Sequence, residues 1–167
     1  MTTGIELLAL ARVQGGELAG TFGQGPEGDA ARAAVVGALL TVRSDADAPV
    51  LRELTRLEID SVRRTDDGCG DTLLACCWML FLLGDVADSA LIWEAKNLNF
   101  DTHCAVDSVF LVPRGIDATV EFATTHGLDD LASWAGNSIG DVEEHVTAWR
   151  EAPYFDSVPQ RPRPWTS

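Results

Sequence analysis

Three residues near the middle of the chain, Glu94, His103 and Asp107, are of types that carry acid–base chemistry. His103 and Asp107 stand four positions apart, the spacing at which two side chains on one helix meet. A carboxylate at that distance can orient and charge an imidazole, which is what a general acid–base pair requires. The same spacing also suits a surface pair beside a helix start, so a structural role stays open.

Glu94 is singled out by the helix predicted over 86–98. At about 100° per residue, the apolar residues of this helix fall on one arc with Glu94 in its middle, whereas Asp88 and Lys96 fall on the opposite face. A carboxylate on an inward face must be paired or hydrogen-bonded. We therefore expect Glu94 to be buried, either in an ion pair with an arginine of the preceding helices or in a cavity.

The segment around Glu94 holds the densest mixture of aromatic and polar side chains in the chain. The candidate binding residues are Trp93, Lys96, Asn97, Asn99 and Asp101. Asn97 and Asn99 suit the end of a helix, and Asp101 can cap the next one, which is predicted over 102–112. No spacing of Cys and His is typical of a metal site, and we expect neither a metal nor a cofactor.

The elements that must position these residues are built around the most apolar stretch of the chain, Thr72–Leu83. It is too short to cross a bilayer, which takes about 20 residues. A segment that is apolar all round predicts a helix buried on all sides, with Trp78 and Leu82 inaccessible to solvent. Gly84 is a typical helix end, and the segment after it predicts the second arm of a helical hairpin.

The rest of the chain predicts short helices joined by short links, which make neighbouring helices antiparallel. We predict an all-α fold, an irregular stack of short antiparallel helical hairpins with about eight helices around the central helix 72–83. The other predicted helices are 4–13, 29–43, 49–64, 115–125, 128–135 and 141–150. The predicted organisation is an N-terminal helix and Gly-rich loop over 1–28, a helical domain over 29–150, and a Pro-rich extended tail over 151–167.

The glycine-rich stretch contains one pattern that is used in nucleotide binding. Gly23–Gly28 matches GxGxxG and precedes a helix. A dinucleotide site also needs a strand before the pattern and a βαβ unit around it. The chain predicts no such strand, and Glu27 and Asp29 would lie where the phosphates bind. The pattern is therefore interpreted as a loop.

A net charge of −14 is the strongest compositional feature. Residues 85–156 contain 14 Asp and Glu against Lys96, Arg114 and Arg150. Such a surface argues against nucleic acid and anionic membranes as partners and speeds encounter with basic proteins. The alternative is that the acidity only keeps a small protein soluble.

The paired helices and acidic character of residues 29–150 resemble helical-repeat binding proteins and the bacterial immunity proteins that neutralise toxins. The abundance of alanine and the excess of arginine over lysine suggest a GC-rich bacterial genome. Because the start of the chain lacks the basic and apolar regions of a signal peptide, we expect a cytoplasmic protein with reduced cysteines.

Two functions follow as hypotheses. The first is a non-catalytic acidic protein-binding module, such as an immunity-type protein that holds a basic partner. The alternative is a small helical enzyme or small-molecule-binding protein of secondary metabolism, with a cavity that contains Glu94.

Overall fold

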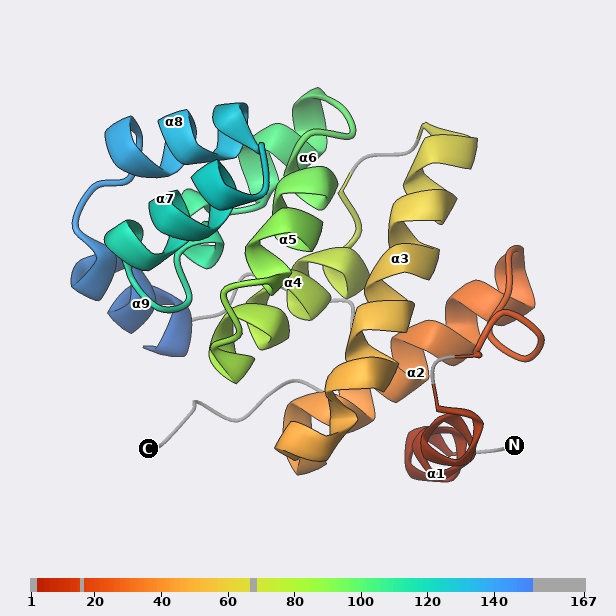
Figure 1. The fold of residues 1–167 in the computed structure, drawn as a ribbon. Coiled ribbons are helices and arrows are strands. Elements are labelled where there is room, and N and C mark those ends of the chain that lie inside the picture. The colour runs from red at the N-terminus through yellow and green to blue at the C-terminus, as the bar shows by residue number, and fades with distance from the viewer. Residues whose placement is uncertain (1–2, 16, 67–68, 152–167) are drawn as a thin grey trace.

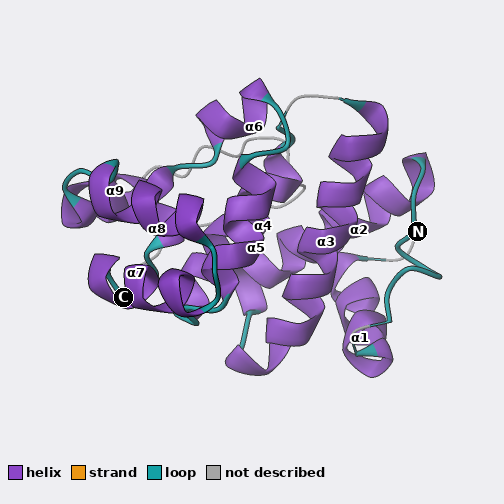
Figure 2. Ribbon diagram, turned by 45° about the horizontal axis from the view of Figure 1, so that its top comes forward, coloured by secondary structure: helices purple, strands orange, loops and turns teal. Residues whose placement is uncertain are grey.

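The fold is built from helices alone wherever the structure, a computed structural model, describes the chain: residues 3–15, 17–66 and 69–151. These ranges contain nine α-helices, two short 3-10 helices and no strand, as Figure 2 shows. The predicted all-α class is therefore confirmed. No helix in these ranges is long and apolar enough to cross a membrane. Except for Glu151, the predicted tail lies outside the described residues.

The helices pass across the molecule in chain order, from α1–α3 on the right of Figure 1, through α4–α6 in the middle, to α7–α9 on the left. The α-helices are α1 Gly4–Gln14, α2 Pro26–Val42, α3 Ala48–Thr65, α4 Asp71–Leu83, α5 Asp88–Lys96, α6 Phe100–Ala105, α7 Ile116–Thr125, α8 Asp129–Asn137 and α9 Val142–Glu151. The 3-10 helices are η1 Asp45–Asp47 and η2 Ser108–Leu111.

The central helix of the prediction is α4, which contacts α2, α3, α5 and η2. Its residues from Leu73 to Leu80 are buried, and Trp78 has no exposed surface. Gly84 ends the helix in the left-handed conformation, at φ 73°. The prediction for Leu82 is wrong, because this side chain is only half-buried. It belongs to the last turn of α4, which lies at the surface and borders an open hollow between α4 and Arg114.

Trp78 lies in an aromatic cluster that joins three parts of the chain. Its ring centre is 5.5 Å from those of Phe81 and Phe110 and 5.9 Å from that of Trp149. The rings of Phe110 and Trp149 meet edge to face at 4.8 Å, a favourable geometry for an aromatic pair. The cluster therefore ties η2 and the last helix α9 directly to the central helix.

A buried arginine holds the N-terminal part of the fold together. Arg32 of α2 has no exposed surface, and its guanidinium donates to Glu58 of α3 and to Asp29, each at 2.5 Å. It also donates to the backbone carbonyls of Phe22 and Gly23 in the glycine-rich loop. The buried charge is thus paired and hydrogen-bonded, as the low dielectric of the interior demands. The glycine-rich loop is fixed in place by the same contacts.

Gly28 explains part of the GxGxxG pattern. A Cβ atom at this position would lie 1.7 Å from the carbonyl oxygen of Gly23, so only glycine lets α2 approach the loop so closely. The glycine spacing thus has a packing role here.

We predict that Trp78→Ala lowers the free energy of unfolding by about 3–5 kcal/mol, because it opens a cavity in the aromatic cluster. Chemical denaturation measures this change. Leu82→Ala serves as the comparison and should cost clearly less, since Leu82 is already partly in solvent. Equal costs would show that Trp78 is no more central than the last turn of α4.

Arg32→Met should lower the free energy of unfolding by about 3–5 kcal/mol near neutral pH, because it leaves the Glu58 carboxylate buried and without its partner. Burial already raises the pKa of Glu58, and Arg32 opposes that rise. In the variant the folded pKa rises further above the unfolded one, so Glu58 takes up a proton on folding. The deficit should therefore be smaller at about pH 5 than at about pH 8.

Arg56→Met is the matched control for this prediction. Arg56 lies on the same helix as Glu58 and is exposed. Its guanidinium is 3.5 Å from the Glu53 carboxylate, which is a loose ion pair. Its loss should change stability by about 0–1 kcal/mol at either pH. A pH-independent deficit for Arg32→Met would contradict the assignment of the cost to Glu58.

Candidate functional site

The α5 helix presents its polar face to the core, which reverses the prediction. Its buried residues are Asp88, Ser89, Ile92, Ala95 and Lys96. The predicted burial of Glu94 is wrong, since 43% of its side chain is exposed. Glu94 does pair with an arginine of a preceding helix, because Arg63 of α3 donates to it at 2.8 Å. This pair lies at the surface, where such pairs contribute little to stability.

Specific partners explain why α5 can bury charged residues. Asp88 receives two hydrogen bonds from Arg52 of α3, at 2.6 and 3.0 Å, and these form a fork-like pair. The amine of Lys96 donates to the backbone carbonyls of His103 and Val106, at 2.5 and 2.7 Å. Each of these partners comes from another segment of the chain. A helical wheel of α5 alone does not include them and therefore predicts the wrong buried face.

The other predicted binding residues lie at helix ends or on the surface. Asn99 caps α6 and accepts from the backbone of Thr102, and the Asn97 amide donates to the carbonyl of Trp93. Asp101 is exposed within the first turn of α6, so it is not the cap of that helix. Trp93 is half-buried, and its ring centre lies 5.8 Å from that of Trp134 on α8.

His103 and Asp107 do not form the predicted pair on one helix. The α6 helix ends at Ala105, and Asp107 follows in extended backbone as the cap of η2, where it accepts from the backbone N–H of Val109 at 3.0 Å. The ring of His103 instead packs edge to face on Trp134. The predicted helix 102–112 is therefore interrupted where an Asp-Ser sequence, a typical capping signal, stands inside it.

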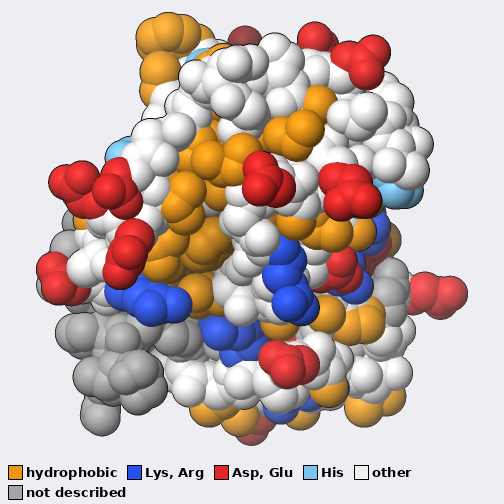
Figure 3. Space-filling model, turned by 60° about the vertical axis from the view of Figure 1, so that its left-hand side comes forward, with side chains coloured by type: hydrophobic (Ala, Val, Ile, Leu, Met, Phe, Trp, Pro, Cys, Tyr) orange, Lys and Arg blue, Asp and Glu red, His pale blue; other side chains and the backbone are white. Residues whose placement is uncertain are grey.

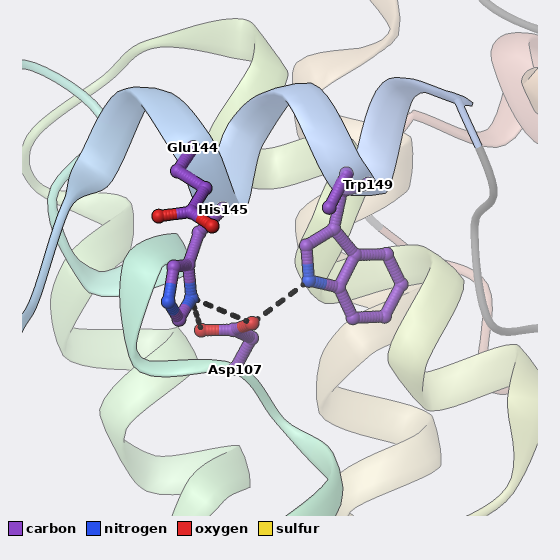
Figure 4. Close-up of a pocket in the computed structure, with 5 residues that line it drawn as sticks. Asp107, Glu144, His145 and Trp149 are labelled. Carbon is purple, nitrogen blue, oxygen red and sulfur yellow. Dashed lines mark hydrogen bonds and ion pairs between the residues drawn. The ribbon is translucent and has the colours of Figure 1, made fainter.

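Asp107 meets a different histidine, as Figure 4 shows. The indole N–H of Trp149 donates to Asp107 at 2.9 Å, and Nδ1 of His145 lies 3.4 Å from the same carboxylate. His145 and Trp149 stand four positions apart on α9 and so share one face of that helix. The half-exposed His145 and the buried Trp149 were not predicted as site residues, since only the tertiary fold brings α9 to Asp107.

Two open hollows meet at Asp107 and Trp149. One, of about 240 Å³, is the hollow drawn in Figure 4 and is lined also by Glu144, His145 and Ala148. The other, of about 370 Å³, is lined also by Lys96, Cys104, Ala105, Val106 and Ser108. Burial lowers the pKa of Lys96, and the charge of Asp107 acts in the opposite direction. The two hollows therefore bring together an amine, an imidazole and two carboxylates, those of Lys96, His145, Asp107 and Glu144, which are groups used in acid–base chemistry.

Charge is distributed unevenly between the two halves of the fold. Several carboxylates before α6 pair with arginines, including Asp47 with Arg12 and Asp88 with Arg52. Others there, such as Glu17 and Glu27, are exposed and make no ion pair with a described residue. In α7–α9 and the links between them, by contrast, no carboxylate of the described chain makes an ion pair. These carboxylates are all exposed: Asp117, Glu121, Asp129, Asp130, Asp141, Glu143, Glu144 and Glu151. We call this set the acidic face.

Figure 3 brings the α7–α9 side forward and shows hydrophobic side chains gathered among acidic ones, with several basic side chains below. The half-buried apolar residues of these helices and their links include Ile116, Val120, Ile139, Val142 and Val146. The surface therefore combines an apolar part with surrounding negative charge.

The cysteines give no sign of redox or metal chemistry. All four are free thiols, and burial raises the pKa of Cys69 to about 11. Among the residues whose structure is described, no three His, Cys, Asp or Glu side chains are grouped so that they could hold a metal ion.

No protein-family model, curated protein sequence or solved structure matches this chain.

Asp107→Ala should lower the free energy of unfolding by about 1–3 kcal/mol, because the indole N–H of Trp149 and the backbone of Val109 both lose their acceptor. In a Trp149→Phe background the same substitution should cost less, and a double-mutant cycle by chemical denaturation measures the difference. Asp117→Ala, which removes an exposed and unpaired carboxylate, is the control and should leave stability nearly unchanged. A coupling free energy near zero between the two substitutions would contradict the hydrogen bond between Trp149 and Asp107.

Proposed function

We propose that this chain is an acidic protein-binding module that holds a basic partner protein through the acidic face of α7–α9. The observation that carries the proposal is that no carboxylate of α7–α9 makes an ion pair in the described chain, whereas several carboxylates before α6 pair with arginines, as Glu58 does with Arg32. Carboxylates without internal partners repel one another, and a cationic partner relieves this repulsion.

The half-buried apolar residues of α7–α9, which belong to the same helices as the acidic face, support the same proposal. Stable interfaces combine a packed apolar centre with a polar rim, and charges at the rim increase the rate of encounter. Half-buried Val142 and Val146 lie on α9 beside exposed Glu143 and Glu144. Such a surface suits a partner that presents arginine or lysine around an apolar contact. An immunity-type role, in which the partner is a toxin, is one form of this proposal.

A small-molecule site is the second candidate function. The sequence predicts it at Glu94, but the structure favours the hollows at Asp107 instead. Glu94 is exposed and paired, and it lines neither of the hollows at Asp107. The groups that favour a ligand there are the carboxylate of Asp107, the imidazole of His145 and the amine of Lys96. Bundles that bind small molecules do so in hollows between helices, where a few polar groups converge.

The partner can be sought by cross-linking in an extract of the source cells, followed by mass spectrometry, and the association rate then measured with the purified partner. The rate should fall steeply as ionic strength rises to about 0.15 M, where charges more than about 8 Å apart are screened. An arginine-rich synthetic peptide provides a defined cationic probe and should show the same trend.

Glu143→Gln with Glu144→Gln should reduce the association rate several-fold at low salt. Glu17→Gln with Glu27→Gln is the matched control, since it removes two exposed negative charges from the other end of the fold. If both double variants reduced the association rate equally, the attraction of the partner would depend on net charge alone and not on the acidic face. A rate that does not respond to salt would overturn the electrostatic proposal.

A further inference from the structure

Lys96 is the only lysine of the chain and stands in an unusual place. It is 3% exposed, although lysine is almost never fully buried without a paired charge. Arg32 and Arg52 each contact a carboxylate, whereas Lys96 makes no ion pair with any residue that the structure describes. Lysine differs from arginine in that burial can remove its proton and leave a nucleophilic amine.

The hydrogen bonds of the Lys96 amine use two of its N–H groups and leave the third position of the nitrogen for either a proton or a lone pair. A neutral amine has two N–H groups and one lone pair, whereas an ammonium group has three donors. Two carbonyl oxygens, of His103 and Val106, accept from the Lys96 amine. The ring of Trp134, 5.6 Å away, is a weaker partner that favours the charged form. Burial acts against the charged form and lowers the pKa of Lys96.

Lys96 also borders open space. Lys96, Asp107 and Ser108 all line the hollow of about 370 Å³. This volume lies in the range of small-molecule sites. A small, neutral carbonyl compound suits it best, because the carboxylate of Asp107 and the acidic face nearby disfavour anions.

We propose that Lys96 is a nucleophilic amine that forms an imine with a small neutral aldehyde or ketone in this hollow. The lone pair of the amine attacks the carbonyl carbon, and one proton of the amine passes to the carbonyl oxygen to give a carbinolamine. The Asp107 carboxylate then takes the remaining proton of the nitrogen and passes it to the hydroxyl, which leaves as water while the C=N bond of the imine forms. The reaction neither gains nor loses electrons, and hydrolysis reverses it. This inference deepens the second candidate function and does not depend on a basic partner.

The test uses the full chain with propionaldehyde and sodium cyanoborohydride at about pH 7, with Nα-acetyl-lysine amide in the same solution as reference. Reduction traps the imine as a stable secondary amine, and peptide mass spectrometry separates Lys96 from the N-terminal amine. We expect Lys96 to be labelled several-fold faster than the reference, because burial lowers the pKa of its amine and leaves a larger share of it neutral at this pH. Labelling of Lys96 slower than the reference, or only in denaturant, would overturn the proposal.

Two variants test the chemistry of the hollow. Asp107→Asn should slow the labelling of Lys96, because the amide cannot carry the proton. Glu17→Gln makes the same change of charge at an exposed position that lines neither hollow at Asp107, and it should leave the rate unchanged. Equal labelling rates for both variants and the parent chain would show that Asp107 takes no part in the reaction. Thermal unfolding checks that each variant is folded. The salt response of partner binding is a separate measurement, so either function can fail without the other.

Discussion

The packing of aromatic rings on Trp78 is the constraint on which the rest of the structure depends. Trp78 has no exposed surface, and its neighbours Phe110 and Trp149 come from η2 and α9, more than thirty and seventy residues later in the chain. The same ring of Trp149 that packs on Trp78 donates its N–H to Asp107. The geometry of the candidate site is therefore set by the core, and the position of α9 cannot change without moving both.

The architecture could be predicted because its signals are local. An unbroken apolar segment that ends at Gly84 defines α4, and the amphipathic pattern of residues 49–64 defines α3. Helix starts and ends were displaced by a few residues, as at α5, where a turn held by the Asp85 side chain delays the helix to Asp88. The prediction succeeded wherever one segment alone determined its own structure.

The candidate site could not be predicted in the same way, because its contacts link distant segments. A helical wheel assumes that charged residues face solvent, and Asp88 and Lys96 break that assumption with partners from α3 and from the end of α6. The sequence points to His103 because it stands four positions from Asp107. In the fold the helix between His103 and Asp107 ends, and α9 brings His145 to Asp107 from 38 residues away. The Asp-Ser sequence at 107–108 was the one local signal of that break.

The uneven pairing of charge also bears on how the two halves of the molecule hold together. The ion pairs of Arg12, Arg32 and Arg52 join elements between α1 and α5, whereas the carboxylates of α7–α9 are exposed and make no ion pair in the described chain, so their like charges are not offset there. Any cation that gathers on the acidic face offsets that internal repulsion. Binding and folding of the second half are then thermodynamically linked, because a ligand that binds only the folded state stabilises it by mass action. Under the proposed function, the abundance of this protein in a cell would accordingly rise and fall with that of the proposed basic partner.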